Sequence, residues 1–288
     1  MAMREYRSNM FSMLLREQCY ALELYNALNN SDYKDEKDVE IFCLENGISL
    51  SVRNDASFLV DDHLNIYEQQ STVNPNMPLR SLIYVAELLK EIIEKTGANL
   101  FDSKLIRIPN PRFVVFYNGR AKLPEIQELR LSEAYINKEN APELELRCTV
   151  YNINPNNNES LKEKSLMLHD YMEFVEAVNA RGPFGSDKNK LREVLETVIE
   201  EFIRDDKLSD FLRKHGKEVV EMETLDFTFE RREELIKKSY YEDGINQGLK
   251  ALVNSLKKHY DDFQSLYREV VSNEEYENCS EEQVRKYY

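Results

Sequence analysis

Asp55, Glu68 and Gln70 have side chains and a spacing that could bind a divalent cation. Glu68 and Gln70 are two residues apart in a stretch with the pattern of a strand, so both side chains should project from one face. Asp55 precedes the apolar run 58–60, which is typical of the neighbouring strand. Two carboxylates from adjacent strands offer the oxygen ligands that Mg²⁺ or Mn²⁺ prefers. Such a cation could activate water for attack on a phosphodiester, with Gln70 positioning the water or a phosphate oxygen.

The non-functional interpretation of the same residues is that they lie on an ordinary solvated surface. An Asp near a Glu-x-Gln is common in an acidic protein, and by spacing alone the functional interpretation is the less frequent one. The position of these residues supports the functional interpretation more strongly than their spacing does, because Glu68 and Gln70 continue the apolar strand Leu64-Asn65-Ile66-Tyr67. Polar side chains without a function are unusual in the continuation of an apolar strand.

The elements that hold these residues can be predicted from periodicity. Residues 48–70 alternate as strands do, with a hairpin turn at Asp61-Asp62. An amphipathic helix is predicted over 9–29 and a second over 78–96, ending at Gly97. Further strands are expected at 112–117, 129–131 and 144–153, and helices at 159–180, 187–204, 206–215 and 230–272.

These elements predict an α+β protein. We expect a restriction-endonuclease-like mixed sheet flanked by helices, followed by a helical C-terminal extension. The nuclease-like core is expected over residues 1–155, and the extension over 156–288 is expected to serve assembly or regulation.

Charge and composition limit the function classes. The net charge of −15 over 288 residues argues against a broad basic surface, so any contact with DNA must be local. One stretch, 101–122, carries five basic residues and one acidic residue, which is a candidate patch if its side chains share a face. The four cysteines lack the spacing of a zinc site. With no signal-like or membrane-spanning apolar run, we expect a soluble cytoplasmic protein that does not bind a membrane.

Other polar residues have both a functional and a structural interpretation. Arg80 and Tyr84 share a helix face and could bind substrate, Arg80 through a phosphate and Tyr84 through a water or a base; the alternative is a solvated arginine and a core tyrosine. Glu23 could support the metal site, although a solvated glutamate is more common. Asp61-Asp62 is more typical of a turn than of a cation site. The four histidines show no mutual spacing that indicates a metal site.

Several motifs resemble the Rpn family, the recombination-promoting nucleases that are also described as transposases and belong to the PD-(D/E)XK superfamily. Asn54-Asp55-Ala56-Ser57-Phe58 is similar to the segment with the first acid, and Tyr67-Glu68-Gln69-Gln70-Ser71-Thr72 is similar to the Tyr-Glu-His-Gln-Ser-Thr box. The block Asn74-Pro75-Asn76-Met77-Pro78-Leu79-Arg80 and the stretches 113–119 and 150–154 are also similar. The resemblance covers roughly residues 10–215.

The resemblance implies a metal-dependent DNA endonuclease that acts in recombination or mobile-element processes. It implies that Asp55 and Glu68 bind Mg²⁺ or Mn²⁺ and that Gln70 takes the place of the superfamily lysine. Position 69, usually histidine in this box, is glutamine; its side chain should point away from Glu68, so the change concerns activity more than fold.

Two other functions remain open at this point. One is a DNA-binding or protein-binding regulatory protein that keeps the nuclease fold without turnover, and the other is a helical assembly protein. A homodimer through the helical half is expected, because cutting both strands of a duplex calls for two sites.

Overall fold

The structure is a computed structural model, which describes residues 2–42, 56–184, 187–224, 248–260, 262–273, 276 and 279–288. Two compact units make up the chain, 1–224 and 225–288. The first unit contains, in order, α1 (Ala2–Leu14), α2 (Gln18–Asn29), η1 (Glu36–Asp38), β1 (Glu40–Phe42), β2 (Ala56–Val60), β3 (His63–Gln70), α3 (Met77–Thr96), β4 (Asn110–Tyr117), β5 (Ile126–Arg130), η2 (Leu131–Ala134), β6 (Arg147–Asn152), α4 (Glu159–Lys164), α5 (Leu166–Ala180), α6 (Lys188–Arg204) and α7 (Ser209–Thr224).

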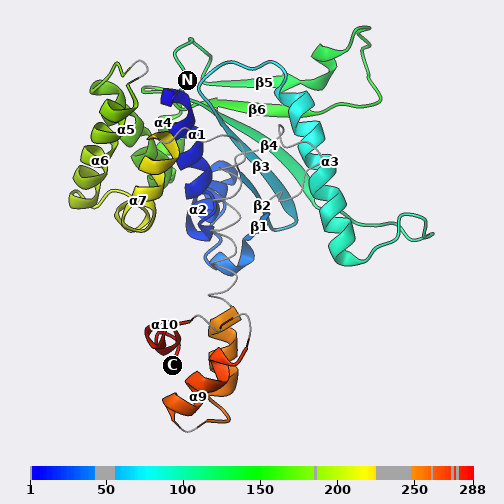
Figure 1. The fold of residues 1–288 in the computed structure, drawn as a ribbon. Helices are drawn as coiled ribbons and strands as arrows, with labels where there is room; N and C mark the ends of the chain where they lie inside the picture. The colour runs from blue at the N-terminus through cyan, green and yellow to red at the C-terminus, as the bar shows by residue number, and fades with distance from the viewer. Residues whose placement is uncertain are drawn as a thin grey trace. The chain divides into compact units, whose positions relative to one another are not determined.

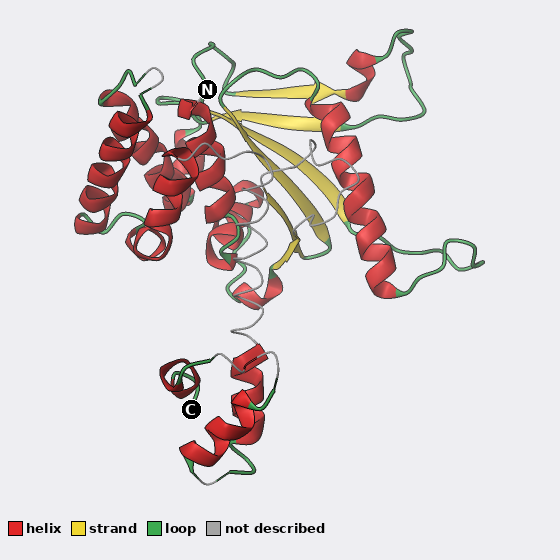
Figure 2. Cartoon of the chain, in the orientation of Figure 1, coloured by secondary structure: helices red, strands yellow, loops and turns green. Residues whose placement is uncertain are grey.

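The strands form one mixed sheet in the order β1-β2-β3-β4-β6-β5 (Figures 1 and 2). β3 and β4, and β4 and β6, run parallel, whereas the other neighbours run antiparallel. The expected α+β class, with helices flanking a mixed sheet and a helical C-terminal region, is confirmed.

The hairpin between β2 and β3 turns at Asp61-Asp62, as the sequence predicts. Both residues have positive φ, 48° and 58°, which is the backbone of the two-residue turn whose twist matches that of the flanking strands. Tyr33 donates a hydrogen bond to Asp61 Oδ2 at 2.6 Å. The aspartate pair therefore has a structural role at this turn.

Alternate residues of β3 face different helices. Leu64 and Ile66 pack with Tyr84, Val85 and Leu88 of α3. Tyr67 faces the other side, where its ring lies 5.0 Å from Phe58 and 5.6 Å from Phe116, measured between centroids. In Figure 1, α3 covers one face of the sheet, and α1 and α2 lie on the other.

The larger apolar core of unit 1 lies on the face opposite α3. It joins α1 and α2 to residues of α4 to α7 and to the sheet. Two smaller clusters lie between α3 and the sheet. The helices of unit 1 after residue 155 thus share a core with the N-terminal helices. The expected functional boundary at residue 155, between a nuclease-like core and an extension, stays a prediction.

Two helices predicted as continuous in unit 1 are interrupted. The one over 9–29 is two helices, because Glu17 is extended and its carboxylate accepts hydrogen bonds from Lys214 and His215 of α7, a tertiary contact that no local pattern shows. The one over 159–180 breaks at Ser165, whose side chain caps α5. The strand expected at 48–52 lies outside the described residues.

Unit 2 is helical in its described part. Residues 248–256, α9 (Phe263–Val271) and α10 (Glu281–Arg285) surround a small core that includes Leu249, Val253 and Leu266. Of the helix expected over 230–272, residues 230–247 lie outside the described residues, and the described part is interrupted before α9, where the Asp262 side chain caps the new helix. None of the described helices is long and apolar enough to cross a membrane.

Candidate functional site

Glu68 is a buried carboxylate in the middle of the sheet, on the face that α3 covers. It is 6% exposed, and it pairs with Val115 of β4. Asp55, the other expected metal ligand, lies outside the described residues. It precedes Ala56 in the sequence, and Ala56 pairs across the hairpin with Tyr67, the neighbour of Glu68.

Arg80 contacts Glu68, and Tyr84 contacts Arg80. The Arg80 guanidinium donates a hydrogen bond of 2.6 Å from Nη2 to Glu68 Oε1, and one of 2.7 Å from Nη2 to the Tyr84 hydroxyl oxygen. Arg80 lies in the first turn of α3, and Tyr84 lies one turn later with its side chain 1% exposed. Spacing on the helix predicts this convergence of the two residues, and the structure adds the contact with Glu68.

Gln70 projects from the same face as Glu68, at the end of β3. Its amide nitrogen contacts the sulfur of Met77, the first residue of α3. Met77 belongs to one apolar cluster beneath α3 and Tyr84 to the other. The polar residues Glu68, Gln70 and Arg80 thus lie where two apolar clusters meet.

Cys148 lies near Glu68 and contacts Ser81, and sequence reasoning missed both. Their side-chain oxygen and sulfur lie 3.4 Å apart, bridging α3 and β6. Burial raises the pKa of the Cys148 thiol to about 11, against the effect of the Ser81 hydrogen bond, and the nearby Glu68 charge contributes to the rise. The thiol is therefore protonated and inert at neutral pH. Only the sheet topology brings Cys148, 80 residues later in the chain, to Glu68.

Gln69 points away from Glu68, as strand alternation predicts. Its amide donates a 2.7 Å hydrogen bond to Asn118 Oδ1, and Asn118 donates one of 3.3 Å to the Tyr171 hydroxyl. The Tyr171 hydroxyl in turn donates to the backbone oxygen of Arg7 at 3.0 Å. Gln69 thus belongs to a buried network that joins β3 to α5 and α1.

Glu23 has a structural role in the described part of the chain. Its Oε1 accepts hydrogen bonds from the Ser165 hydroxyl at 2.7 Å and from the backbone N–H of Met167 at 2.8 Å, at the start of α5. A carboxylate here satisfies a helix N–H that has no partner within the helix and interacts favourably with the helix dipole. Glu23 lies on the face of the sheet opposite Glu68.

In the basic stretch 101–122, Arg112 lies apart from Arg120 and Lys122. Arg112, in β4, hydrogen bonds to Asn29 and to His63 Nε2, near the end of α2. Arg120 and Lys122 follow the other end of that strand and are exposed. The interpretation of this stretch as an ordinary mixed surface is the one that the structure supports.

A second group of titratable residues lies on α5, and sequence reasoning missed it. His169, Asp170 and Glu173 can each place a ligand atom within 4.8 Å of the others. The spacing of His169 and Glu173 at i and i+4 was the available signal. Glu173, one of the three potential metal ligands, already forms an ion pair with Lys207.

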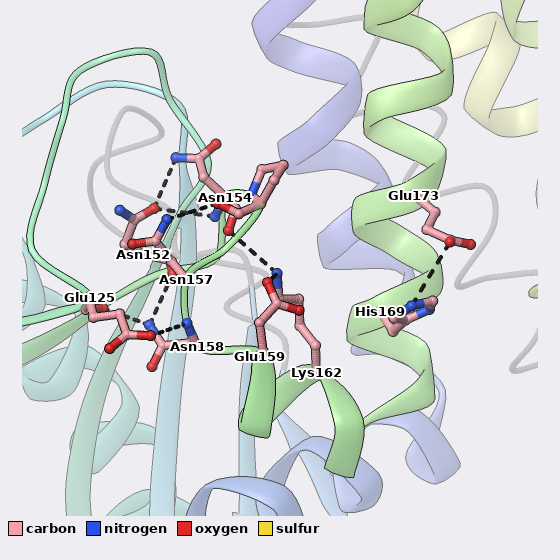
Figure 3. A network of polar contacts seen from close by, with 10 residues as sticks. Glu125, Asn152, Asn154, Asn157, Asn158, Glu159, Lys162, His169 and Glu173 are labelled. Atoms are coloured by element: carbon pink, nitrogen blue, oxygen red, sulfur yellow. Dashed lines mark hydrogen bonds and ion pairs between the residues drawn. The ribbon is translucent and has the colours of Figure 1, made fainter.

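An asparagine-rich turn leads from the sheet to these helices (Figure 3). Asn158, with φ of 48°, donates from its side chain to the backbone oxygens of Glu125 and Asn152, at 2.6 and 2.9 Å. Lys162 forms a 2.6 Å ion pair with Glu159. These contacts fix the passage from β6 to α4, and they have a structural explanation.

Comparisons with protein-family models, with curated proteins and with solved structures found no match to this chain.

Proposed function

We propose that the chain is a divalent-metal-dependent endonuclease that hydrolyses phosphodiester bonds in DNA. The observation that carries the proposal is the buried carboxylate of Glu68 in the sheet, paired with the Arg80 guanidinium, which also donates to the Tyr84 hydroxyl. Buried acids are uncommon unless they are paired or bind a metal, and an arginine beside an acid is the usual partner of a phosphate.

The donor set fits a hard cation. Glu68 offers carboxylate oxygens and Gln70 an amide oxygen on the same face of β3, and Asp55 is proposed as the second carboxylate. Oxygen donors of this kind suit Mg²⁺ or Mn²⁺. When bound, the cation supplies a water of lowered pKa and neutralises charge on the phosphate.

The other residues bind and orient the substrate. The planar guanidinium of Arg80 matches the two free oxygens of a phosphodiester. Gln70 places the attacking water or a phosphate oxygen through a neutral hydrogen bond. The apolar clusters on both sides exclude bulk water, which strengthens these interactions.

A second candidate is a DNA-binding or regulatory protein without turnover. The ion pair between Arg80 and Glu68 favours it, because the acid already has a cationic partner. The net charge of −15 also limits nonspecific attraction to DNA.

Cleavage of supercoiled plasmid tests the proposal. Purified full-length protein is incubated with Mg²⁺ or Mn²⁺, and with EDTA, beside the variants Asp55→Asn and Glu68→Gln. We expect nicking that requires metal and falls by about 100-fold or more in either variant, since even indirect support of a metal ligand is worth 10- to 100-fold. Glu128→Gln is the matched control, because Glu128 is an exposed strand glutamate that also pairs with an arginine.

Two outcomes contradict the proposal. Wild-type rates in folded Glu68→Gln would remove this residue from the chemistry. Absence of cutting by folded wild type, with DNA still bound, would favour the second candidate.

A further inference from the structure

The two side chains of the Arg80–Glu68 ion pair differ in their exposure to solvent. Glu68 has a side chain that is 8% exposed, whereas that of Arg80 is 34% exposed, and their charged atoms are 2.6 Å apart. The arginine thus occupies the solvent side of the pair. A ligand that arrives from solvent meets the guanidinium before the carboxylate.

The guanidinium also has alternative partners within its own helix. Arg80 Nε and Nη2 donate to the Tyr84 hydroxyl at 3.2 and 2.7 Å, and Nη1 lies 3.5 Å from the Met77 sulfur. Its central carbon lies 5.7 Å from the centre of the Tyr84 ring. These neutral partners can hold the side chain near the site after the contact with Glu68 is broken.

Arginine and a metal ion compete for the same acceptor. Glu68 Oε1, which accepts the hydrogen bond from Arg80, is an oxygen that a divalent cation would coordinate. A cation beside an intact pair would also meet the positive charge of the guanidinium at short range. Phosphodiester oxygens relieve both the competition for Oε1 and the charge repulsion. They accept hydrogen bonds from the guanidinium N–H groups, and they add negative charge.

We propose that Arg80 couples the binding of nucleic acid to the binding of metal at Glu68. Without nucleic acid, Arg80 neutralises Glu68 and weakens cation binding. A phosphate of the backbone draws the guanidinium away from Oε1, and the carboxylate then binds the cation. This inference rests on the proposed function in that the cation site is the one at Glu68.

The coupling is reciprocal, since the free energies of the two binding events form a closed cycle. If nucleic acid raises the affinity for metal, metal raises the affinity for nucleic acid by the same factor. Couplings of this kind are typically about 5- to 150-fold. The device would keep the protein free of bound metal, and hence inactive, away from its substrate.

The alternative is that the ion pair only holds α3 on the sheet. In that case, replacing Arg80 lowers stability and leaves the affinity for metal unchanged. Metal affinity, measured without cleavage, separates the two explanations.

The test is titration of full-length protein with Mn²⁺, in which free Mn²⁺ is followed by electron paramagnetic resonance. Titrations are run with and without a short duplex whose linkages are phosphorothioates, for wild type, Arg80→Gln and Glu68→Gln. Arg130→Gln is the matched control, because Arg130 is a strand arginine that pairs with Glu128 away from α3.

For wild type, we expect the duplex to strengthen Mn²⁺ binding by roughly 5- to 150-fold. Arg80→Gln should bind Mn²⁺ more tightly than wild type without duplex, and the duplex should then add little. Arg130→Gln should behave as wild type does. If Arg80→Gln does not fold, as judged by circular dichroism, Arg80→Lys replaces it. Lysine keeps the charge and lacks the fork, so Mn²⁺ affinity without duplex should stay near wild type and the effect of the duplex should shrink.

Failures of the two proposals are distinguishable. Equal Mn²⁺ affinity in wild type and Arg80→Gln, or no effect of the duplex on wild type, overturns the coupling, and the metal site stands if Glu68→Gln has lost binding. Wild-type affinity in Glu68→Gln overturns the metal site, and with it the coupling.

Discussion

At the scale of single residues, burial and hydrogen-bond partners separate the acids with structural roles from those that are candidates for chemistry. Glu23 and Glu68 are both acids near the sheet, on opposite faces. Glu23 accepts hydrogen bonds at the start of α5. Glu68 contacts Arg80, which in turn donates to Tyr84, and helix spacing predicts these two residues as substrate-binding candidates.

Replacing Glu23 by alanine should therefore destabilise the protein without changing its chemistry. Loss of a capping carboxylate costs about 1–2 kcal/mol of unfolding free energy. Urea unfolding of Glu23→Ala measures this loss, and plasmid cleavage in the same preparation should stay at wild-type levels. Glu193→Ala, an exposed position on α6, is the control. A fall in cleavage without a fall in stability would instead assign Glu23 to the metal site.

At the scale of elements, the contact of α7 with the start of α2 depends on ionisable groups. His215 Nε2 lies 3.0 Å from Glu17 Oε1, and its Nδ1 lies 3.0 Å from Glu218 Oε2. Lys214 also binds Glu17, and Arg16 acts on Glu218 through its charge. The hydrogen bond with Glu218 raises the pKa of His215 above 6.5, although burial opposes it, and the same bond lowers the pKa of Glu218 below 4.5.

The stability that His215 contributes should be lost as pH rises. A raised pKa in the folded state gives a contribution that is complete below about pH 6.5 and is lost as the pH passes through the raised value. The Glu218 contribution has the opposite sign, since it is present above pH 4.5 and lost on acidification. Urea unfolding between about pH 6 and 8 should show a decline in wild type that is flatter in His215→Gln. Parallel profiles for the two proteins would contradict this assignment.

Local patterns predict most elements and some of the site. Alternation over residues 63–70 places Glu68 and Gln70 on one face, and helical spacing places Arg80 near Tyr84. The break before α2 cannot be predicted in this way, because it depends on α7, which is nearly 200 residues away in sequence. The position of Cys148 likewise depends on strand order. Asp55 lies outside the described residues, so its place in the site stays a prediction.

At the scale of the whole molecule, each unit has its own core. The clusters of unit 1 contain residues up to Val220, and that of unit 2 contains Leu249 and later residues. A cluster of its own is what a folding unit requires.

A chain that ends after Thr224 should therefore fold and unfold cooperatively. A chain that ends after Arg204 is the control: it lacks α7, whose Phe211, Leu212 and Val219 are buried in the main core, so it should fail to fold. Loss of one large buried side chain typically costs 2–5 kcal/mol, and several exceed the stability of most domains. Thermal unfolding followed by circular dichroism measures both chains. A chain of 224 residues with no cooperative transition would show that unit 1 depends on the remainder.

The two-residue turn at Asp61-Asp62 has a consequence for how the sequence can change over evolutionary time. Side chains in β3 alternate between α3 and the larger core, so one residue inserted between the turn and Glu68 would exchange the two sets. Glu68 would then project into the apolar core, and Tyr67 would take its place opposite Arg80. Insertions and deletions should therefore be absent from this stretch, and they should accumulate in surface connections such as 98–109 and 135–146.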